Sequence, residues 1–436
     1  MFIPKRRARG GARVIDRDRN LTGGAGEVST LFSRIFSASP PGLEAGGRSS
    51  DIDYRLLAPL LLTSVTIQAV TALVRVTTSY RAIELHLPVV LLGVISAVFA
   101  ILPIFLAVWV GRYMDRGNDA QAAWIGSGLL VLACAGFRFF ANSVTALLLL
   151  TALFGIAHLF MMASQQMLCI RCSGPRGRDS VFGNYLVASA VGQGLGPYLI
   201  AWSAGSAMLP PTDTLFDFAL AISVLSLLSS FAMRPAPKLA PHEASKPVVP
   251  VRTLIRQSGL MAVLIASVIT ITSQDLLTIY LPLLGAANNI NAGDIGILLT
   301  VRSVLALISR MGYAKVIRIV GRGPLTLASM LGSGLGFACL ALPIPLSAMY
   351  AAMAVMGFSL GIATTLSLTN VVDLASAEAM GTVMSLRITG NRIGQVAVPF
   401  MASLIAAATG VGGIFVIIAL SLAVSGATVH FSRDEP

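Results

Sequence analysis

The sequence predicts an all-α membrane protein, with 12 transmembrane helices arranged as two pseudo-symmetric bundles of six. Of its 436 residues, 55% are hydrophobic and only 11% are charged, whereas a soluble domain carries about 25% charged residues. The apolar residues fall in blocks of roughly 20, the length that crosses about 30 Å of hydrocarbon as a helix. Short motifs also recur between the two halves of the chain.

Each apolar block is expected to be a helix, because a helix satisfies its own backbone hydrogen bonds inside the bilayer. The blocks lie near residues 56–79, 87–110, 121–141, 145–169, 181–203, 214–233, 259–283, 294–314, 324–342, 346–370, 381–408 and 410–431. The short segments of alternating polarity that are typical of a membrane β-barrel do not occur in this sequence. The protein is therefore predicted to be a multi-pass helical protein of the lipid bilayer.

The polar segments divide the predicted helices into two groups. Residues 1–55 mix Arg, Gly, Ser and Pro without an apolar block, which predicts a disordered basic tail rather than a signal peptide. Three interpretations of the tail are open: it contacts anionic lipids, it has no function, or the start codon is assigned too far upstream. Residues 234–256, rich in Pro and charge, are predicted to link a bundle at 56–233 to a bundle at 257–431. Residues 432–436 are predicted to be a C-terminal tail.

Positive charge is distributed unevenly, and this predicts the orientation. Twenty-five of the 31 Lys and Arg residues flank the helices on the side of the two termini, and only Arg81 and Arg138 lie in the opposite loops. Cytoplasmic loops carry such an excess, so both termini are predicted to be cytoplasmic, in the inner membrane of a bacterium. The net charge of +12 thus follows from topology and does not indicate a nucleic-acid partner.

An internal repeat relates the two halves at an offset of 202 positions. Gly155 corresponds to Gly357, and the pattern G-Q-x-x-x-P occurs once in each half. Its members are Gly192, Gln193 and Pro197 in the fifth block, and Gly394, Gln395 and Pro399 in the eleventh. Several matches at one offset indicate duplication of a six-helix unit.

The segment after the second block resembles a loop motif of the major facilitator superfamily, G-x-x-x-D-R-x-G-R-R. Its matching residues are Gly111, Asp115 and Arg116, whereas the final basic pair is replaced by Asn118 and Asp119. Two parallel six-helix repeats are also the architecture of this family, whose substrates bind near the membrane midplane between the halves. The resemblance implies secondary active transport of a small solute. Asp115 and Arg116 fit either a latch between the halves or a plain turn between two helices.

A second resemblance concerns the direction of transport. Gly192-x-x-x-Gly196-Pro197 is similar to the core of a motif in family members that export by proton antiport. It implies proton-coupled export by alternating access. The alternatives are a proton-coupled importer of an organic anion and a non-transporting sensor or scaffold of the same fold. Small residues at this spacing also allow helices to pack closely in any membrane protein.

Ionisable and amide side chains inside the apolar blocks are the candidate substrate- and ion-binding residues, because each is costly in hydrocarbon unless it faces protein or water. They are Arg75, His158, Gln193, Asp275, Arg302, Asn391, Arg392 and Gln395. Cations outnumber acids in this group, which favours an anionic or carboxylate-bearing solute over a cationic one.

Asp275 and Arg302 are the most specific candidate pair for ion and substrate binding, since a short outer loop joins their helices. The hypothesis is that both line the central cavity, where Asp275 exchanges the coupling ion, a proton, and Arg302 holds an anionic group. A purely structural ion pair is the alternative. His158 fits either proton coupling or a bundle histidine whose hydrogen bonds are satisfied. Gln193 and Gln395 fit either substrate contacts or a hydrogen bond between helices.

Two motifs of other function classes are absent from the sequence. It contains no H-E-x-x-H and no Walker lysine loop, and neither an enzyme nor an ATP-driven pump is predicted. Cys169 and Cys172 form one C-x-x-C, but a zinc site needs four ligands and no second pair follows. No metal or cofactor is expected, and the protein is predicted to work as a monomer.

Reporter fusions test the predicted orientation. A reporter that is active only in the cytoplasm should be active after Lys246 and inactive after Asn289, because the charge distribution places these residues on opposite sides. A reporter that is active only outside the membrane should give the opposite pattern. Reversed activities at both positions would overturn the orientation or the number of helices.

Overall fold

A computed structural model describes residues 52–115, 117–172, 178–234, 259–374 and 380–431. The predicted N-terminal tail up to residue 51, residues 235–256 of the linker, the C-terminal tail and Arg116 of the loop motif lie outside these ranges. Asp115 ends a helix, but its side chain also lies outside the description.

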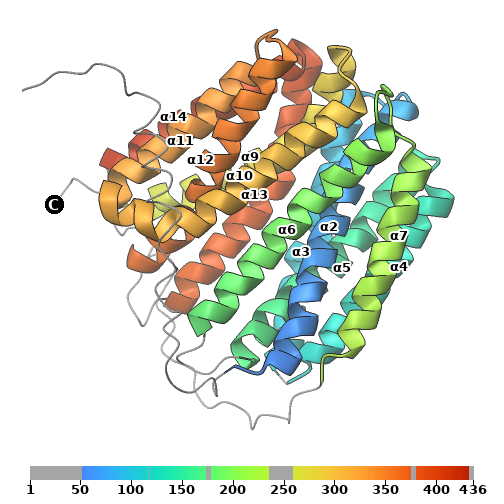
Figure 1. The fold of residues 1–436 in the computed structure, drawn as a ribbon, viewed down its shortest axis with the longest axis vertical. Coiled ribbons are helices and arrows are strands. Elements are labelled where there is room, and N and C mark those ends of the chain that lie inside the picture. Colours follow the sequence, from blue (N-terminus) through green and yellow to red (C-terminus); the bar gives the residue numbers. More distant parts are fainter. Residues whose placement is uncertain (1–51, 116, 173–177, 235–258, 375–379, 432–436) are drawn as a thin grey trace, which may run out of the picture. The chain divides into compact units, whose positions relative to one another are not determined.

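The described residues form twelve long helices, so the predicted all-α fold is confirmed (Figure 1). They are α2 (Tyr54–Glu84), α3 (Val89–Asp115), α4 (Asp119–Phe140), α5 (Val144–Arg171), α6 (Arg178–Ala204), α7 (Thr212–Phe231), α9 (Leu260–Ala287), α10 (Ala292–Val320), α11 (Arg322–Leu340), α12 (Leu346–Leu374), α13 (Met380–Thr409) and α14 (Val411–Phe431).

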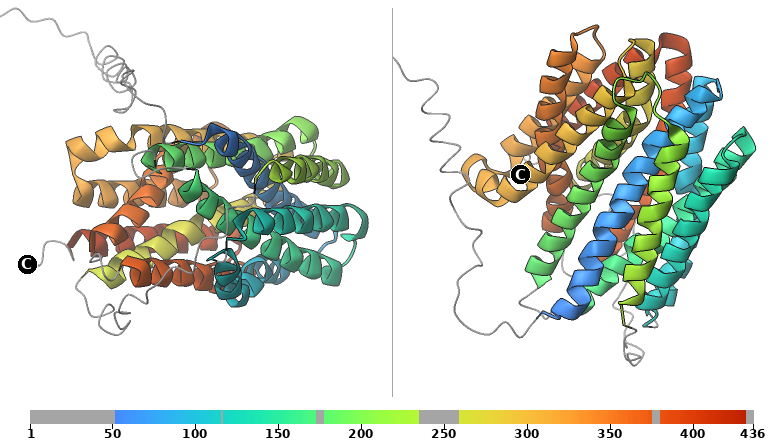
Figure 2. Two further views of the ribbon diagram at one scale, coloured as in Figure 1. Left: turned by 90° about the horizontal axis from the view of Figure 1, so that it is seen from below. Right: turned by 45° about the vertical axis from the view of Figure 1, so that its right-hand side comes forward.

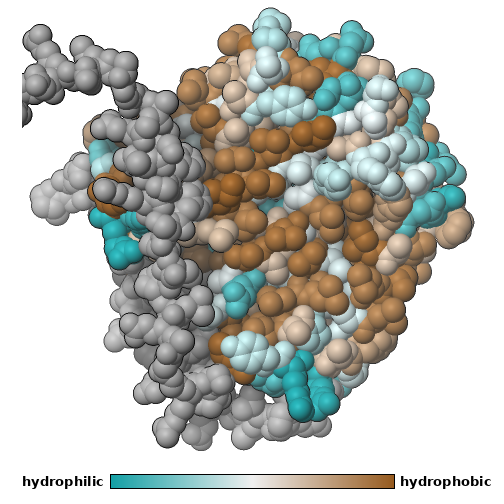
Figure 3. Space-filling model, in the orientation of Figure 1, coloured by the Kyte–Doolittle hydropathy of each residue, from teal (hydrophilic) through white to brown (hydrophobic). Residues whose placement is uncertain are grey.

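Eleven of these twelve helices are long and apolar enough to cross a membrane. The exception is α6, whose sequence carries many Gly, Ser and amide residues. On the face seen in Figure 3, apolar side chains cover the middle of the helices and polar ones gather toward their ends. Large apolar side chains on the outside, such as Phe105, Trp202 and Leu228, are 75%, 67% and 62% exposed. Such a surface suits lipid better than water, and the chain is a multi-pass membrane protein.

Helix contacts fall into two sets, which we call the first half (α2–α7) and the second half (α9–α14). Between the halves, α6 packs along α10, α3 packs along α13, and α2 approaches α9. In both Figure 1 and Figure 2, α6 runs beside α2. Three helix pairs therefore decide how the halves meet.

Glycines bring the halves into backbone contact at one end, which we call the outer end: the end where α6 finishes and α10 begins. The amide of Ala292 donates to the carbonyl of Ala207 at 2.9 Å. A Cβ atom on Gly296 would lie 2.6 Å from the amide nitrogen of Ala201, and one on Gly93 would lie 2.5 Å from the carbonyl oxygen of Pro399. Both distances are far below van der Waals contact, so the halves can meet this closely only because no side chain intervenes.

The outer contact gives a testable prediction for Gly296→Val. The added side chain should force α6 and α10 apart by about 1 Å or more and open the outer end. A cysteine introduced by Thr278→Cys, on a background without native cysteines, should then react several-fold faster with a membrane-impermeant thiol reagent added outside.

Gly312→Val is the matched control, because Gly312 lies on the same helix and a Cβ there would meet nothing within 4 Å. Equal labelling of Thr278→Cys with the two valine variants would contradict the role given to the Gly296 contact.

Candidate functional site

A cavity of about 570 Å³ lies between the two halves. It extends from mid-helix positions such as Asp275 toward the end opposite the outer contacts, which we call the inner end and where Gly111 and Met114 near the end of α3 line it. All eight predicted substrate- and ion-binding residues are among its lining, namely Arg75, His158, Gln193, Asp275, Arg302, Asn391, Arg392 and Gln395. The helices of both halves thus bring together residues up to 320 positions apart.

An ion pair joins the halves in the middle of this cavity. The guanidinium of Arg75 on α2 pairs with the carboxylate of Asp275 on α9, and the two side chains are 15% and 12% exposed. The other oxygen of Asp275 accepts a hydrogen bond of 2.9 Å from Nε2 of Gln395. Gln395 in turn accepts a hydrogen bond of 3.0 Å from Arg392. A continuous polar chain therefore runs from α2 through α9 to α13.

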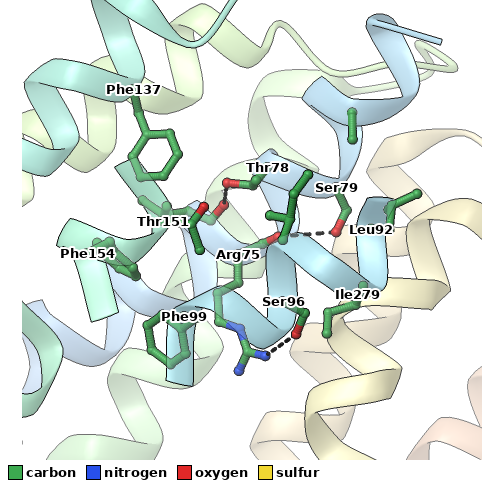
Figure 4. Close-up of a pocket in the computed structure, with 13 residues that line it drawn as sticks. Arg75, Thr78, Ser79, Leu92, Ser96, Phe99, Phe137, Thr151, Phe154 and Ile279 are labelled. Carbon is green, nitrogen blue, oxygen red and sulfur yellow. Dashed lines mark hydrogen bonds between the residues drawn. The ribbon is translucent and has the colours of Figure 1, made fainter. Parts of the chain in front are cut away.

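Arg75 is held on its outer side as well. Its guanidinium lies over the ring of Phe99, 5.1 Å from the centroid, and contacts the Ser96 hydroxyl at 3.5 Å. Figure 4 shows these side chains around a second, much smaller cavity of about 30 Å³. The hydroxyl of Thr151, which lines that cavity, is buried without a hydrogen-bond partner among the described residues. The small cavity has room for about one water molecule beside Arg75.

Two arginines on α10 face the cavity without a carboxylate partner. Arg302 is 8% exposed, donates only to the Ser303 hydroxyl at 3.2 Å, and has a buried Nε without a partner among the described residues. Arg310 also lines the cavity, and the described chain offers it neither a hydrogen bond nor an ion pair. Among the described residues, these two cationic groups at the cavity wall thus have no ion-pair partner.

The alternative of a structural ion pair between Asp275 and Arg302 is not what the structure shows, since Asp275 pairs with Arg75. The reason lies in helix packing. Although a short loop joins α9 to α10, α9 packs more closely against α2 and α13. The carboxylate of Asp275 therefore reaches groups on α2 and α13. That α9 and α10 are adjacent in sequence does not bring Asp275 into contact with Arg302.

The other predicted polar residues are placed as follows. The His158 ring lies 5.3 Å from the Phe99 ring, and its Nδ1 is buried without a hydrogen-bond partner in the described part of the chain. Asn391 accepts a hydrogen bond of 3.1 Å from Ser267. Of the two alternatives for Gln193 and Gln395, the hydrogen bond between them is not formed, since Gln395 donates to Asp275.

The glycines of the repeated motif, together with Gly196, have a packing role. A Cβ on Gly192 or Gly196 would lie 2.3 Å or 2.7 Å from backbone oxygens of α2, and a Cβ on Gly394 would lie 2.4 Å from Val268 on α9. Pro197 and Pro399 lie inside α6 and α13. The motif thus allows α6 to pack on α2, and α13 on α9.

The electrostatic balance of the cavity is basic. Its described lining carries four arginines, Arg75, Arg302, Arg310 and Arg392, but a single acid, Asp275. Within the described ranges no group of three or more His, Cys, Asp or Glu residues could hold a metal ion. The arrangement is suited to binding a negatively charged solute, because buried guanidinium groups gain most from anionic partners.

Residues 60–287 and 263–436 match the sequence profile of the Major Facilitator Superfamily. The chain belongs to the major facilitator superfamily. A mutant form of the nucleoside transporter NupG has a similar structure, with a TM-score of 0.71 and 13% identity over 86% of this chain and 99% of that one. The human organic anion transporter MFSD10 (TETRAN) is similar with a TM-score of 0.62 and 16% identity, over 86% and 99% of the two chains. A search of curated protein sequences returned no significant match.

As a member of this superfamily, the protein is a membrane transporter of a small-molecule substrate. At such low identity, the two solved structures are informative about the fold alone. The cavity between the halves lies where substrates of this transporter class bind.

Sequence reasoning missed Arg310, Phe99 and Met162 in the lining of the transporter's cavity. Arg310 was counted among the charges that flank the membrane, although it follows Arg302 by eight residues, or a little over two helical turns. That spacing was a usable signal for a shared face. No signal distinguished Phe99 and Met162 from other apolar residues of their helices.

The ion pair predicts strong coupling between Arg75→Gln and Asp275→Asn. Each single change leaves a charge in a largely buried site, so the double variant should lose less stability than the sum of the two. We expect a coupling energy of about 1–3 kcal/mol from denaturant unfolding of the purified transporter in micelles.

Arg138 and Asp217 supply the control, because this pair is more exposed, at 32% and 52%. Its cycle should give a coupling energy of about 0–1 kcal/mol. A coupling between Arg75 and Asp275 no larger than this would show that the contact does not hold the halves together.

Proposed function

We propose that this transporter moves an organic anion together with protons, and that Asp275 carries the coupling proton. One observation supports the anion above all: Arg302 and Arg310 face the cavity without a carboxylate partner in the described chain. Uncompensated charges in a low-dielectric setting are costly unless a ligand or water relieves them. An anionic group would relieve both arginines.

Electrostatics supports movement of the anion and the proton in the same direction. In the present arrangement the carboxylate of Asp275 pairs with Arg75. An anion bound beside it competes for the same cations and disfavours a second negative charge, so anion binding and protonation of Asp275 promote each other. Such coupling is reciprocal. Ligands that promote each other's binding are carried together.

The ion pair also supplies a control point for alternating access. Because it joins α2 to α9 across the halves, protonation of Asp275 removes one of the attractions that hold them in this arrangement. The small cavity beside Arg75 offers hydroxyl groups to the released guanidinium. With an inward proton gradient, the anion is taken up together with the proton. We assign this activity to a monomer in the bacterial cytoplasmic membrane, with both termini in the cytoplasm.

Proton antiport and export, expected from the resemblance at Gly192, Gly196 and Pro197, receive less support. The two glycines lie against the backbone of α2, so close packing is enough to account for them. Antiport of an anion would also require the proton and the anion to oppose each other's binding, contrary to the electrostatics of the cavity.

Proteoliposomes with a trapped pH dye test this function. Adding organic anions outside should acidify the interior in the presence of the transporter, because protons enter with them. An uncoupler should collapse uptake of the anion that is driven by an imposed pH gradient. Proton movement that organic cations drive and organic anions do not would refute the proposal. Anion uptake that requires ATP and proceeds without an ion gradient would refute it as well.

Two variants separate the roles of the residues. Asp275→Asn should abolish accumulation driven by the pH gradient but retain exchange of anion across the membrane. Arg302→Gln should raise the half-saturating anion concentration at least about tenfold, in line with the loss of one charge-assisted contact. Arg318→Gln is the matched control on the same helix, since Arg318 donates to Ala314 and does not line the cavity. Equal effects of the two arginine changes would refute the role of Arg302.

A further inference from the structure

Two pairs of helices, one from each half, give the cavity walls of different chemistry. The wall from α3 and α5 in the first half is mainly apolar, with Phe99, Met114, Leu159, Met162 and Ala163, and its polar members are His158 and Gln166. The wall from α10 and α13 in the second half is basic and polar, with Arg302, Arg310, Asn391, Arg392 and Gln395. A ligand between the halves therefore contacts hydrocarbon, sulfur and aromatic groups on one side and guanidinium groups on the other.

We infer that the substrate is an amphipathic organic anion, whose apolar body lies on the α3–α5 wall while its acidic group binds the arginines of α10 and α13. The inference rests on the proposed anion transport and narrows its substrate class. A compact, strongly hydrated anion would satisfy the basic wall alone. It would leave the apolar wall either wet or in contact with a charge.

The apolar wall is built to hold its shape. Leu159 is 7% exposed and packs in one cluster with Val110, Met114 and Phe160. The sulfur of Met162 accepts hydrogen bonds from Gln68 at 3.3 Å and, more weakly, from Tyr185 at 3.7 Å. These contacts hold the thioether, and thioethers adapt well to the flat faces of aromatic ligands. The wall is therefore a surface on which an apolar group can dock.

The basic wall offers charge at two depths. Arg302 and Arg310 are separated by roughly 12 Å along α10, at 1.5 Å per residue. Arg302 lies near mid-helix, whereas Arg310 lies toward the inner end. Arg392, near the middle of α13, has only the amide oxygen of Gln395 as a hydrogen-bond partner for its guanidinium among the described residues. Arg302 and Arg392 are thus placed to hold the acidic group at the depth of the apolar wall, and Arg310 to draw anions toward them.

Two probes with the same head group test the inference. Benzenesulfonate and methanesulfonate are both fully ionised monoanions and differ only in their apolar part. Binding to the purified full-length transporter in lipid nanodiscs, measured by calorimetry, should be at least about tenfold tighter for benzenesulfonate, because only its ring can bury apolar surface on the α3–α5 wall.

Met162→Gln should remove most of this difference, since it makes the apolar wall polar while leaving the arginines in place. It should lower the affinity for benzenesulfonate several-fold and leave that for methanesulfonate unchanged. Met167→Gln is the matched control, because Met167 lies on the same helix and does not line the cavity. Arg302→Gln should weaken the binding of both probes, whereas Arg318→Gln should weaken neither.

The outcomes separate the two levels of the argument. Equal affinities for the two probes, both sensitive to Arg302→Gln, would overturn the amphipathic substrate and leave anion transport standing. An equal effect of Met162→Gln and Met167→Gln would also overturn it. Binding of neither probe, or binding that is insensitive to Arg302→Gln, would overturn the anion site itself and with it the proposed function.

Discussion

One constraint governs this molecule, which is that several charged side chains lie in a cavity where little water reaches them. In the described lining of the cavity a single acid, Asp275, stands among four arginines, and it pairs with the one that belongs to the opposite half, Arg75. The pair compensates two charges at once and ties α2 to α9. Because Asp275 is shared with Gln395, and Gln395 with Arg392, a change at one carboxylate is felt on three helices. Arg302 and Arg310 have no ion-pair partner among the described residues.

The contacts at the outer end and the polar chain have different physical origins. At the outer end the halves meet through Gly93, Gly293 and Gly296, where backbone lies against backbone. That contact is steric and insensitive to protonation. In the middle of the bundle the attraction is the electrostatic one between Arg75 and Asp275. A transporter that must release one end while closing the other benefits from holding them by different forces.

Much of the fold was predictable because hydrocarbon imposes simple demands on sequence. Apolar blocks of membrane-spanning length located the helices, and polar residues inside these blocks located the cavity: every one of the eight lines it. Pairing was not predictable, since whether Asp275 meets Arg75 or Arg302 depends on helix packing that the order of helices does not reveal. The apolar half of the cavity was equally hidden, because Leu159 and Met162 look like lipid-facing or core residues on any membrane helix.

The composition of α6 has a consequence for how the chain is made. With its Gly, Ser and amide residues, this helix is the only one of the twelve described that is not apolar enough to count as a membrane span, and a segment of that kind partitions weakly into lipid when alone. Its glycines fit against α2, which is synthesised earlier and is strongly apolar. Packing against α2 therefore favours the entry of α6 into the bilayer, and the same glycines that shape the mature transporter contribute to the insertion of its fifth described helix.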